Sequence, residues 1–252
     1  MAERRFKAVV LDLFDTLVCW DPGRLPTLEF RGRVIRSTMP LLYPRISEAL
    51  ETQIELGAVM EIYHAVIEDI IAEREQHLIE VTCHERFVRT LGRLGLPQGD
   101  NLIAVAHELR RTHMQGVRAV TSAPPSWVEA VKRIAPSYRL GLLSNFDDAE
   151  TGREILYDTG IAHLFEAIII SAELALRKPN PLIFRRMLEM LNLEAHEILF
   201  VGDTPREDVV GARNAGIAIA WLSRGKGPIS ESIPTPDFIL EDLTGLPALL
   251  ES

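Results

Sequence analysis

The sequence predicts a doubly wound parallel α/β domain that is interrupted near its start by an all-helical insertion. Short apolar runs without alternation recur along the chain, as in strands buried on both faces of a parallel sheet. Between about 120 and 222 these runs alternate with helical patterns, which indicates βαβ crossovers. From about 20 to 117 apolar residues keep helical spacing, and no strand-like run interrupts them.

The strands of the core are predicted from their composition. The first is the run Ala8–Phe14, which has β-branched residues at its centre and is broken by Asp12. Four later runs have the same character: 139–144, 167–171, 198–202 and 217–222. An unpaired charge inside such a buried run is costly, so Asp12 indicates a functional carboxylate.

The helices of the core are predicted from start and stop signals. A helix over 126–134 follows Pro124–Pro125, a favourable helix start. Three further helices are expected over 149–158, before Gly160; over 181–191, with Asn180 as its N-cap; and over 206–215, before Gly216.

The helical insertion sets the domain boundaries. Its apolar positions fall into three groups with helical spacing, within 59–71, 87–94 and 102–109. We therefore expect an α/β core built from 1–18 and 119–252, and a helical cap over 19–118.

Charge and cysteine content exclude several classes of protein. The 252 residues hold 27 basic and 36 acidic side chains, a net charge of −9, which disfavours binding to nucleic acid or to anionic membranes. Cys19 and Cys83 are the only cysteines, which is typical of a reducing compartment. No apolar stretch approaches the ~18–20 residues that span a bilayer. We expect a cytoplasmic protein with a small-molecule substrate; its oligomeric state is not predicted.

Polar residues follow the predicted strands where parallel sheets bind ligands, beyond their carboxyl ends. These residues are Asp12–Thr16, Ser144–Asn145, Arg177–Pro179 and Gly202–Thr204, with Asp208 beyond. Carboxylates, a hydroxyl–amide pair and a lysine are thus expected to converge in one crevice, which predicts an active site.

The order and spacing of these four motifs resemble the haloacid dehalogenase-like superfamily, a large set of mainly phosphoryl-transferring hydrolases. The resemblance covers nearly the whole chain, including a helical cap after the first motif. Each motif alone is short, but four at matching strand ends are specific. The resemblance implies a Rossmann-like core and a hydrolase.

The resemblance also implies a Mg²⁺ site and a nucleophile. Asp12 is identified as the nucleophile, which would form an aspartyl-phosphate intermediate. Mg²⁺ would be held by the Asp12 carboxylate, the main-chain carbonyl of Phe14 and Asp203, with Asp208 supporting the waters of the metal.

The remaining motif residues are implied to bind the phosphoryl group. Ser144, Asn145 and Lys178 would hold its oxygens, and Lys178 would also offset the charge of the carboxylates. Thr16 would orient the loop or the phosphate by a hydrogen bond.

One position departs from the family pattern. Phe14 stands where the family has a second aspartate, which protonates the leaving alcohol and activates water. Loss of a general acid–base group costs ~10²–10⁴ in rate. In the first interpretation, the chain is a phosphatase for substrates with good leaving groups, or a phosphatase that recruits Asp15 or a cap residue as its acid.

Two other interpretations stay open. Dehalogenases of the superfamily also lack that aspartate, because halide leaves without a proton, and Arg33, Arg36 and Arg45 would supply a carboxylate clamp. The second of these interpretations is a catalytically weak phosphate-binding or regulatory protein. Retention of Asp203 and Asp208 favours phosphoryl chemistry, since a metal-independent dehalogenase needs no acidic pair there.

Overall fold

A computed structural model describes residues 6–251. They divide into two compact units, 6–20 with 122–251 and the intervening 21–121. The first unit is an α/β core, and the second is mainly helical.

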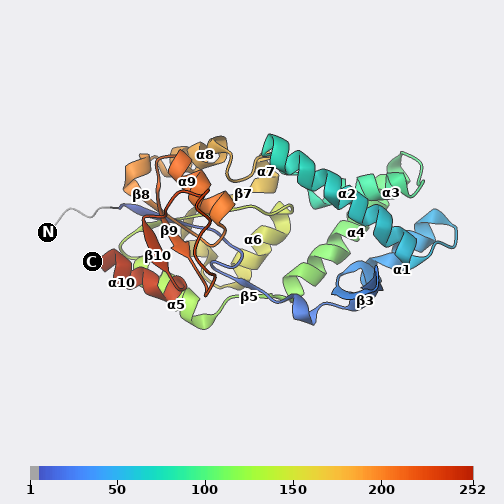
Figure 1. The fold of residues 1–252 in the computed structure, drawn as a ribbon, viewed down its shortest axis with the longest axis horizontal. Helices are drawn as coiled ribbons and strands as arrows, with labels where there is room; N and C mark the ends of the chain where they lie inside the picture. The colour runs from blue at the N-terminus through green and yellow to red at the C-terminus, as the bar shows by residue number, and fades with distance from the viewer. Residues whose placement is uncertain (1–5, 252) are drawn as a thin grey trace. The chain divides into compact units, whose positions relative to one another are not determined.

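The core is built on one six-stranded sheet, in the order β10-β9-β8-β1-β6-β7 (Figure 1). The strands are β1 (Ala8–Leu11), β6 (Arg139–Ser144), β7 (Phe165–Ile170), β8 (Ile198–Gly202), β9 (Ala218–Leu222) and β10 (Phe238–Leu240). Every neighbouring pair is parallel. Ala8 of β1 lies opposite both Arg139 and Ile198, so the first strand of the chain is central. The doubly wound core that the sequence predicts is confirmed.

Helices cover both faces of this sheet (Figure 1). One face packs against α5 (Pro125–Ile134), α6 (Ala149–Asp158) and α10 (Leu246–Glu251), and the other against α8 (Pro181–Leu191) and α9 (Val210–Asn214). Shorter helical turns are α7 (Ser171–Leu174), η2 (Ala162–Leu164), η3 (Ala195–Glu197), η4 (Pro205–Val209) and η5 (Leu243–Gly245). Asn180 caps α8 by accepting from the Leu182 amide, as the sequence predicts, and Asp148 caps α6.

The second unit contains four long helices. They are α1 (Met39–Leu50), α2 (Leu56–His77), α3 (Cys83–Arg93) and α4 (Asp100–Ala119), preceded by η1 (Pro22–Arg24) and the antiparallel pair β3 (Thr27–Phe30) and β4 (Arg33–Arg36). A separate short pairing joins β2 (Cys19–Trp20) with β5 (Thr121–Ser122).

The β3–β4 hairpin corrects the expectation that no strand lies between 20 and 117. Its turn residues Arg31 and Gly32 both have positive φ, 51° and 71°, as in the two-residue turns that match strand twist. Of the eight strand residues only Leu28 is buried. Leu28 and Phe30 alternate with polar residues, but a strand of four residues is too short for this alternation to be distinguished from a loop in the sequence.

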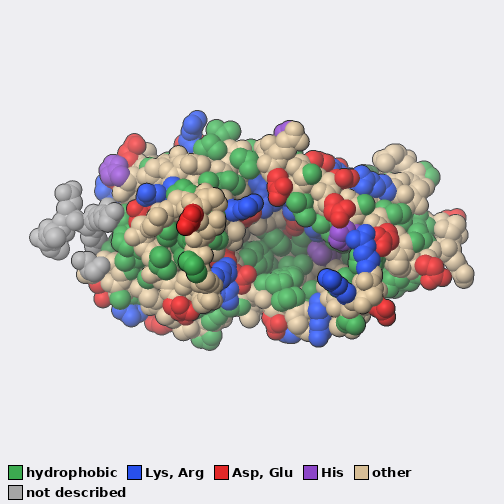
Figure 2. Space-filling model, in the orientation of Figure 1, with side chains coloured by type: hydrophobic (Ala, Val, Ile, Leu, Met, Phe, Trp, Pro, Cys, Tyr) green, Lys and Arg blue, Asp and Glu red, His purple; other side chains and the backbone are tan. Residues whose placement is uncertain are grey.

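Acidic and basic side chains are interspersed on the surface of the helical unit (Figure 2). Several form ion pairs between neighbouring helices, including Arg89–Glu73, Arg93–Asp69 and Arg45–Glu108. Within residues 6–251, no helix has both the length and the apolar composition that crossing a bilayer requires.

Close packing between α9 and α8 makes Gly211 a sensitive position. A Cβ atom at Gly211 would overlap the ring of Phe184 and lie 3.2 Å from the Cα of Pro179. We predict that Gly211→Ala lowers the free energy of unfolding by about 1–3 kcal/mol, measured by urea denaturation. Gly57→Ala in α2 is the matched control, because a Cβ there meets no atom within 4 Å; it should be neutral or stabilising by up to about 1 kcal/mol. Equal stability of the two variants would contradict the packing described here.

Candidate active site

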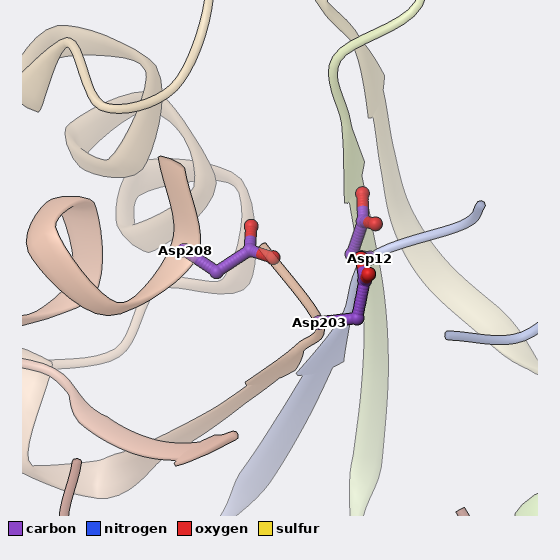
Figure 3. Close-up of side chains that lie close together, drawn as sticks. All are labelled: Asp12, Asp203 and Asp208. Carbon is purple, nitrogen blue, oxygen red and sulfur yellow. The ribbon is translucent and has the colours of Figure 1, made fainter. Parts of the chain in front are cut away.

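Three buried carboxylates meet at the carboxyl ends of the central strands (Figure 3). Asp12 follows β1 directly and Asp203 follows β8, while Asp208 approaches from η4. One carboxylate oxygen of each lies within 4.8 Å of the others. The strand ends alone predict this convergence.

Asp208 reaches the cluster because of the local backbone. It lies in η4, a π-helical turn, a distortion that is frequent at functional sites. Its Oδ2 atom accepts a hydrogen bond of 2.8 Å from the Thr204 amide. A Cβ at residue 202 would overlap the Asp208 side chain, so glycine at position 202 leaves the room that this carboxylate needs.

Lys178 is shared between two of the carboxylates. Its Nζ atom lies 2.8 Å from Asp12 Oδ1 and 2.7 Å from Asp208 Oδ1, and the side chain is only 1% exposed. Burial alone would lower the pKa of Lys178, but the two carboxylates outweigh burial and raise it. The ammonium therefore stays charged and neutralises part of the cluster.

Burial has the opposite effect on the acids. It raises the pKa of Asp12 to about 7, more than the charge of Lys178 lowers it, and Asp208 and Asp203 add to the increase. Burial likewise raises the pKa of Asp208 against the effect of Lys178. One ammonium is thus insufficient for this group of carboxylates, and a further cation would favour their ionised forms.

Asn145 holds the main chain of Lys178. Its Oδ1 atom accepts from the Lys178 amide at 2.7 Å, and its Nδ2 atom donates to the Lys178 carbonyl at 3.0 Å. This paired contact fixes the β7–α8 connection against the end of β6. Direct contact of Asn145 with a phosphoryl group stays a prediction.

Two buried hydroxyls near the strand ends have no partner among the described residues. Ser144 ends β6 and is 1% exposed, and Thr16 is fully buried in the loop after β1. Neither oxygen makes a hydrogen bond within residues 6–251. Buried polar groups are rarely left unpaired, so both oxygens are suited to a ligand.

Phe14 presents an aromatic surface where the family pattern has an acid. Its ring packs against Phe146, with 4.8 Å between ring centroids. Its carbonyl oxygen accepts no hydrogen bond from any residue that the structure describes, which leaves it available as a ligand.

Asp15, one possible replacement acid, is engaged elsewhere. It has φ of 56°, and its carboxylate forms an ion pair with Arg224, which also donates to the Asp15 carbonyl at 3.3 Å. The Arg224 guanidinium lies 5.3 Å from the centre of the Trp127 ring. The Asp15 carboxylate is therefore engaged in a structural ion pair with Arg224.

Three further residues contact the site and were not predicted from the sequence. They are Arg224, Trp221, whose indole N–H donates to the Asp203 carbonyl at 3.0 Å, and Lys226, which pairs with the Asp203 carboxylate. Trp221 lies in β9, and the other two residues follow that strand. The strand-end rule applied to this fifth strand would have found Arg224 and Lys226.

The donor set fits Mg²⁺. Asp12, Asp203 and Asp208 offer only oxygen atoms, as does the free carbonyl of Phe14, and hard divalent cations prefer such ligands. Burial raises the pKa values of Asp12 and Asp208, and a cation bound between them would favour their ionised forms.

Comparison with known proteins identifies the family. The sequence model of the haloacid dehalogenase-like hydrolases matches residues 6–216. The chain belongs to this family. The match runs from β1 to the end of α9 and so includes all four strand-end motifs.

Curated relatives of this hydrolase carry phosphatase names. Phosphoserine phosphatase of Thermus thermophilus is 36% identical over 122 residues, which are 47% of this chain and 49% of the relative. N-acylneuraminate-9-phosphatase of Rattus norvegicus is 35% identical over 115 residues, 45% of this chain and 46% of the relative. The chain thus spans about half the length of these relatives. Glyceraldehyde 3-phosphate phosphatase of Pyrococcus furiosus is 26% identical over 98% of this chain and 93% of its own.

Solved structures share the fold. A 2-haloacid dehalogenase from Pseudomonas syringae pv. tomato aligns with a TM-score of 0.70 at 20% identity, over 98% of each chain. A HAD phosphatase from Thermococcus onnurineus aligns with a TM-score of 0.64, also at 20% identity, over 97% of this chain and 98% of its own. Both kinds of hydrolase have this architecture, so the fold alone does not choose between them.

The shared ammonium generates a stability prediction. Removing it by Lys178→Gln leaves two buried carboxylates without their counter-charge, so the free energy of unfolding should fall by about 3 kcal/mol or more. The measurement is chemical denaturation with EDTA present. Exposed Lys132 of α5 is the control, and Lys132→Gln should change stability by less than about 0.5 kcal/mol. Adding Asp208→Asn to Lys178→Gln should restore part of the loss; no loss at all would contradict the buried ion pairs.

Proposed function

We propose that this family member is a Mg²⁺-dependent phosphatase that hydrolyses a small phosphomonoester through an aspartyl-phosphate on Asp12. The observation that carries the proposal is the cluster of three buried carboxylates around a buried lysine at the ends of β1 and β8. Such a cluster suits a dianionic phosphoryl group only when a divalent cation joins it. The phosphatase names of the relatives support the same chemistry.

Asp12 is suited to act as the nucleophile. Lys178 binds its Oδ1 atom, while Oδ2 accepts no hydrogen bond from the described residues and is free to attack phosphorus. The Lys178 contact fixes the rotation of the carboxylate, which reduces the entropic cost of in-line attack. The phosphoryl group would pass to Asp12 and then to water.

The remaining residues would bind the transferring group. The ammonium of Lys178 and the hydroxyls of Ser144 and Thr16 would contact phosphoryl oxygens, and the buried, unpartnered state of both hydroxyls supports this role. Mg²⁺ held by Asp12, Asp203 and the Phe14 carbonyl, with Asp208 supporting its waters, would neutralise charge on the phosphoryl group.

Phe14 limits proton transfer. An aromatic side chain gives no proton to a leaving alcohol, and Asp15 is tied to Arg224. The core therefore favours substrates whose leaving group departs without a proton.

Haloacid dehalogenation is the second candidate, and Phe14 is the observation that favours it. The arginines that would clamp a haloacid carboxylate are partly engaged: Arg45 pairs with Glu108 and Glu48, and Arg36 donates to the Leu25 carbonyl. The nucleophile and the two buried acids beside it, Asp203 and Asp208, would also repel a haloacid anion. We therefore place phosphate hydrolysis first, and a halide-release assay without added metal separates the two.

The nucleophile assignment predicts complete loss of turnover in Asp12→Asn. Phosphate release from p-nitrophenyl phosphate should fall at least about a thousandfold, because the amide does not form the covalent intermediate. EDTA should abolish the activity of the unmodified enzyme, and Mg²⁺ should restore it. Activity that survives the substitution or ignores EDTA would reject the mechanism.

The leaving-group argument predicts that Phe14→Asp improves the hydrolysis of alkyl phosphates. A new acid at this position should raise kcat by up to ~10²–10⁴ for glycerol phosphate and much less for p-nitrophenyl phosphate, whose leaving group needs no proton. Phe14→Leu is the control that removes the ring without adding an acid. Equal effects on both substrates would show that the acid is supplied elsewhere. Negligible turnover in the parent and in Phe14→Asp, with phosphate binding retained, would favour a binding protein.

A further inference from the structure

Lys226 extends from a solvent-exposed segment to a buried carboxylate. Its Nζ atom lies 2.6 Å from Asp203 Oδ2 and 3.3 Å from the Asp203 carbonyl oxygen. The Lys226 side chain is 47% exposed, whereas that of Asp203 is 7% exposed. Unlike Lys178, this ammonium can exchange its carboxylate partner for water at little cost.

Asp203 does not need Lys226 to keep its position. The Thr204 hydroxyl donates to Asp203 Oδ1 at 3.1 Å, and the buried indole of Trp221 donates to the Asp203 carbonyl at 3.0 Å. Trp221 lies in β9, and Thr204 follows the end of β8. Among the described residues Lys226 alone donates to Oδ2, so an ammonium and a divalent cation would compete for the lone pairs of this atom.

The segment that carries Lys226 runs over 223–237 between β9 and β10, and it is anchored at its two ends. At the first end the Ser223 and Arg224 amides donate to the Leu240 and Glu241 carbonyls, and at the second the Asp237 amide donates to the Ile219 carbonyl.

The middle of the segment is weakly held, and the Lys226 amide donates to the Ser223 carbonyl at 2.7 Å. Within 227–236 the described backbone makes two hydrogen bonds, both local: the Ile233 amide donates to the Ser230 carbonyl, and the Ser232 amide donates to the Ser230 hydroxyl. Ile229 and Ile233 pack only partly buried against the core. The Lys226–Asp203 ion pair is therefore a substantial fraction of what holds the middle of this segment, 226–236, to the core.

We propose that Lys226 is a competitor, built into the chain, for the cation at Asp203, so that divalent-cation binding displaces it and loosens the middle of the 223–237 segment. This inference rests on the proposed function, because it takes Asp203 as a metal ligand. A monovalent ion brings no more charge than the ammonium it would replace. Lys226 therefore also makes the site selective for divalent cations and sets the Mg²⁺ concentration at which it fills.

The first test is Mg²⁺ binding by titration calorimetry. Lys226→Gln removes the competing charge, so Mg²⁺ should bind roughly two- to fivefold more tightly than to the parent protein. Arg206→Gln is the matched control, because Arg206 is exposed, lies three residues from Asp203 and has no ion pair among the described residues. It removes the same charge without the contact and should change the affinity less than Lys226→Gln does.

The second test follows amide hydrogen exchange in the segment. Adding Mg²⁺ to the parent protein should speed exchange at Lys226 and Ile233, the reverse of the usual protection by a ligand. In Lys226→Gln the same amides should exchange fast with or without Mg²⁺. Protection of these amides by Mg²⁺ would overturn the proposal.

The Asp203→Asn variant separates failure of this inference from failure of the proposed function. If Asp203→Asn binds Mg²⁺ as the parent does, Asp203 is not a ligand and the proposed metal site is wrong. If Asp203→Asn loses Mg²⁺ binding but Lys226→Gln binds equally or more weakly, the metal site stands. Lys226 would then support the ion rather than compete with it, and only this inference fails.

Discussion

The site depends on one buried ammonium held between two buried carboxylates. Lys178 contacts Asp12 and Asp208 at hydrogen-bond distance, and none of the three side chains is more than 9% exposed. Acids buried this deeply favour their neutral forms, and a carboxylic acid is a poor nucleophile. Lys178 favours the ionised form of Asp12, which the proposed nucleophile requires, and it also ties together β1, the β7–α8 connection and η4. Asn145 and Gly202 act through this contact, the first by fixing the Lys178 main chain and the second by leaving space for Asp208.

Two lysines partly neutralise the carboxylates of the site, and they differ in burial and in number of partners. Lys178 is enclosed, has two carboxylate partners and has a raised pKa, so it is a permanent part of the site. Lys226 has one carboxylate partner and is half exposed. Three ionised carboxylates with two ammonium groups carry a net negative charge, and this remaining charge would attract a divalent cation rather than a dianionic phosphate alone. In the proposed function, metal binding would therefore precede or accompany substrate binding.

The sequence was sufficient for the features that depend on burial. Strands covered on both faces have no polar alternation, so β1, β6 and β8 were visible as apolar runs, and Asp12 was visible as the charge that breaks one of them. The strand-end rule then placed Asp203, Asp208 and Lys178 together, because parallel strands end at one edge.

The features that the sequence did not reveal depend on partners distant in the chain. The contact of Asn145 with the Lys178 main chain is a tertiary pairing with no local pattern. The same is true of the Asp15–Arg224 ion pair, although Arg224 stands at a strand end. The edge strand β10 has three residues, none of them fully buried, so its apolar run was too short to separate from a loop.

The central place of β1 constrains how the protein is made. Its neighbours in the sheet are β6 and β8. During synthesis, Ala8 can therefore pair on both sides only after Arg139 and Ile198 have left the ribosome. The unit over 21–121 is continuous in sequence and can fold during that interval, whereas the first strand has no partner on either side. A nascent chain therefore carries an apolar, unpaired strand until most of its synthesis is complete, and the carboxylate at the end of that strand has no lysine beside it until then.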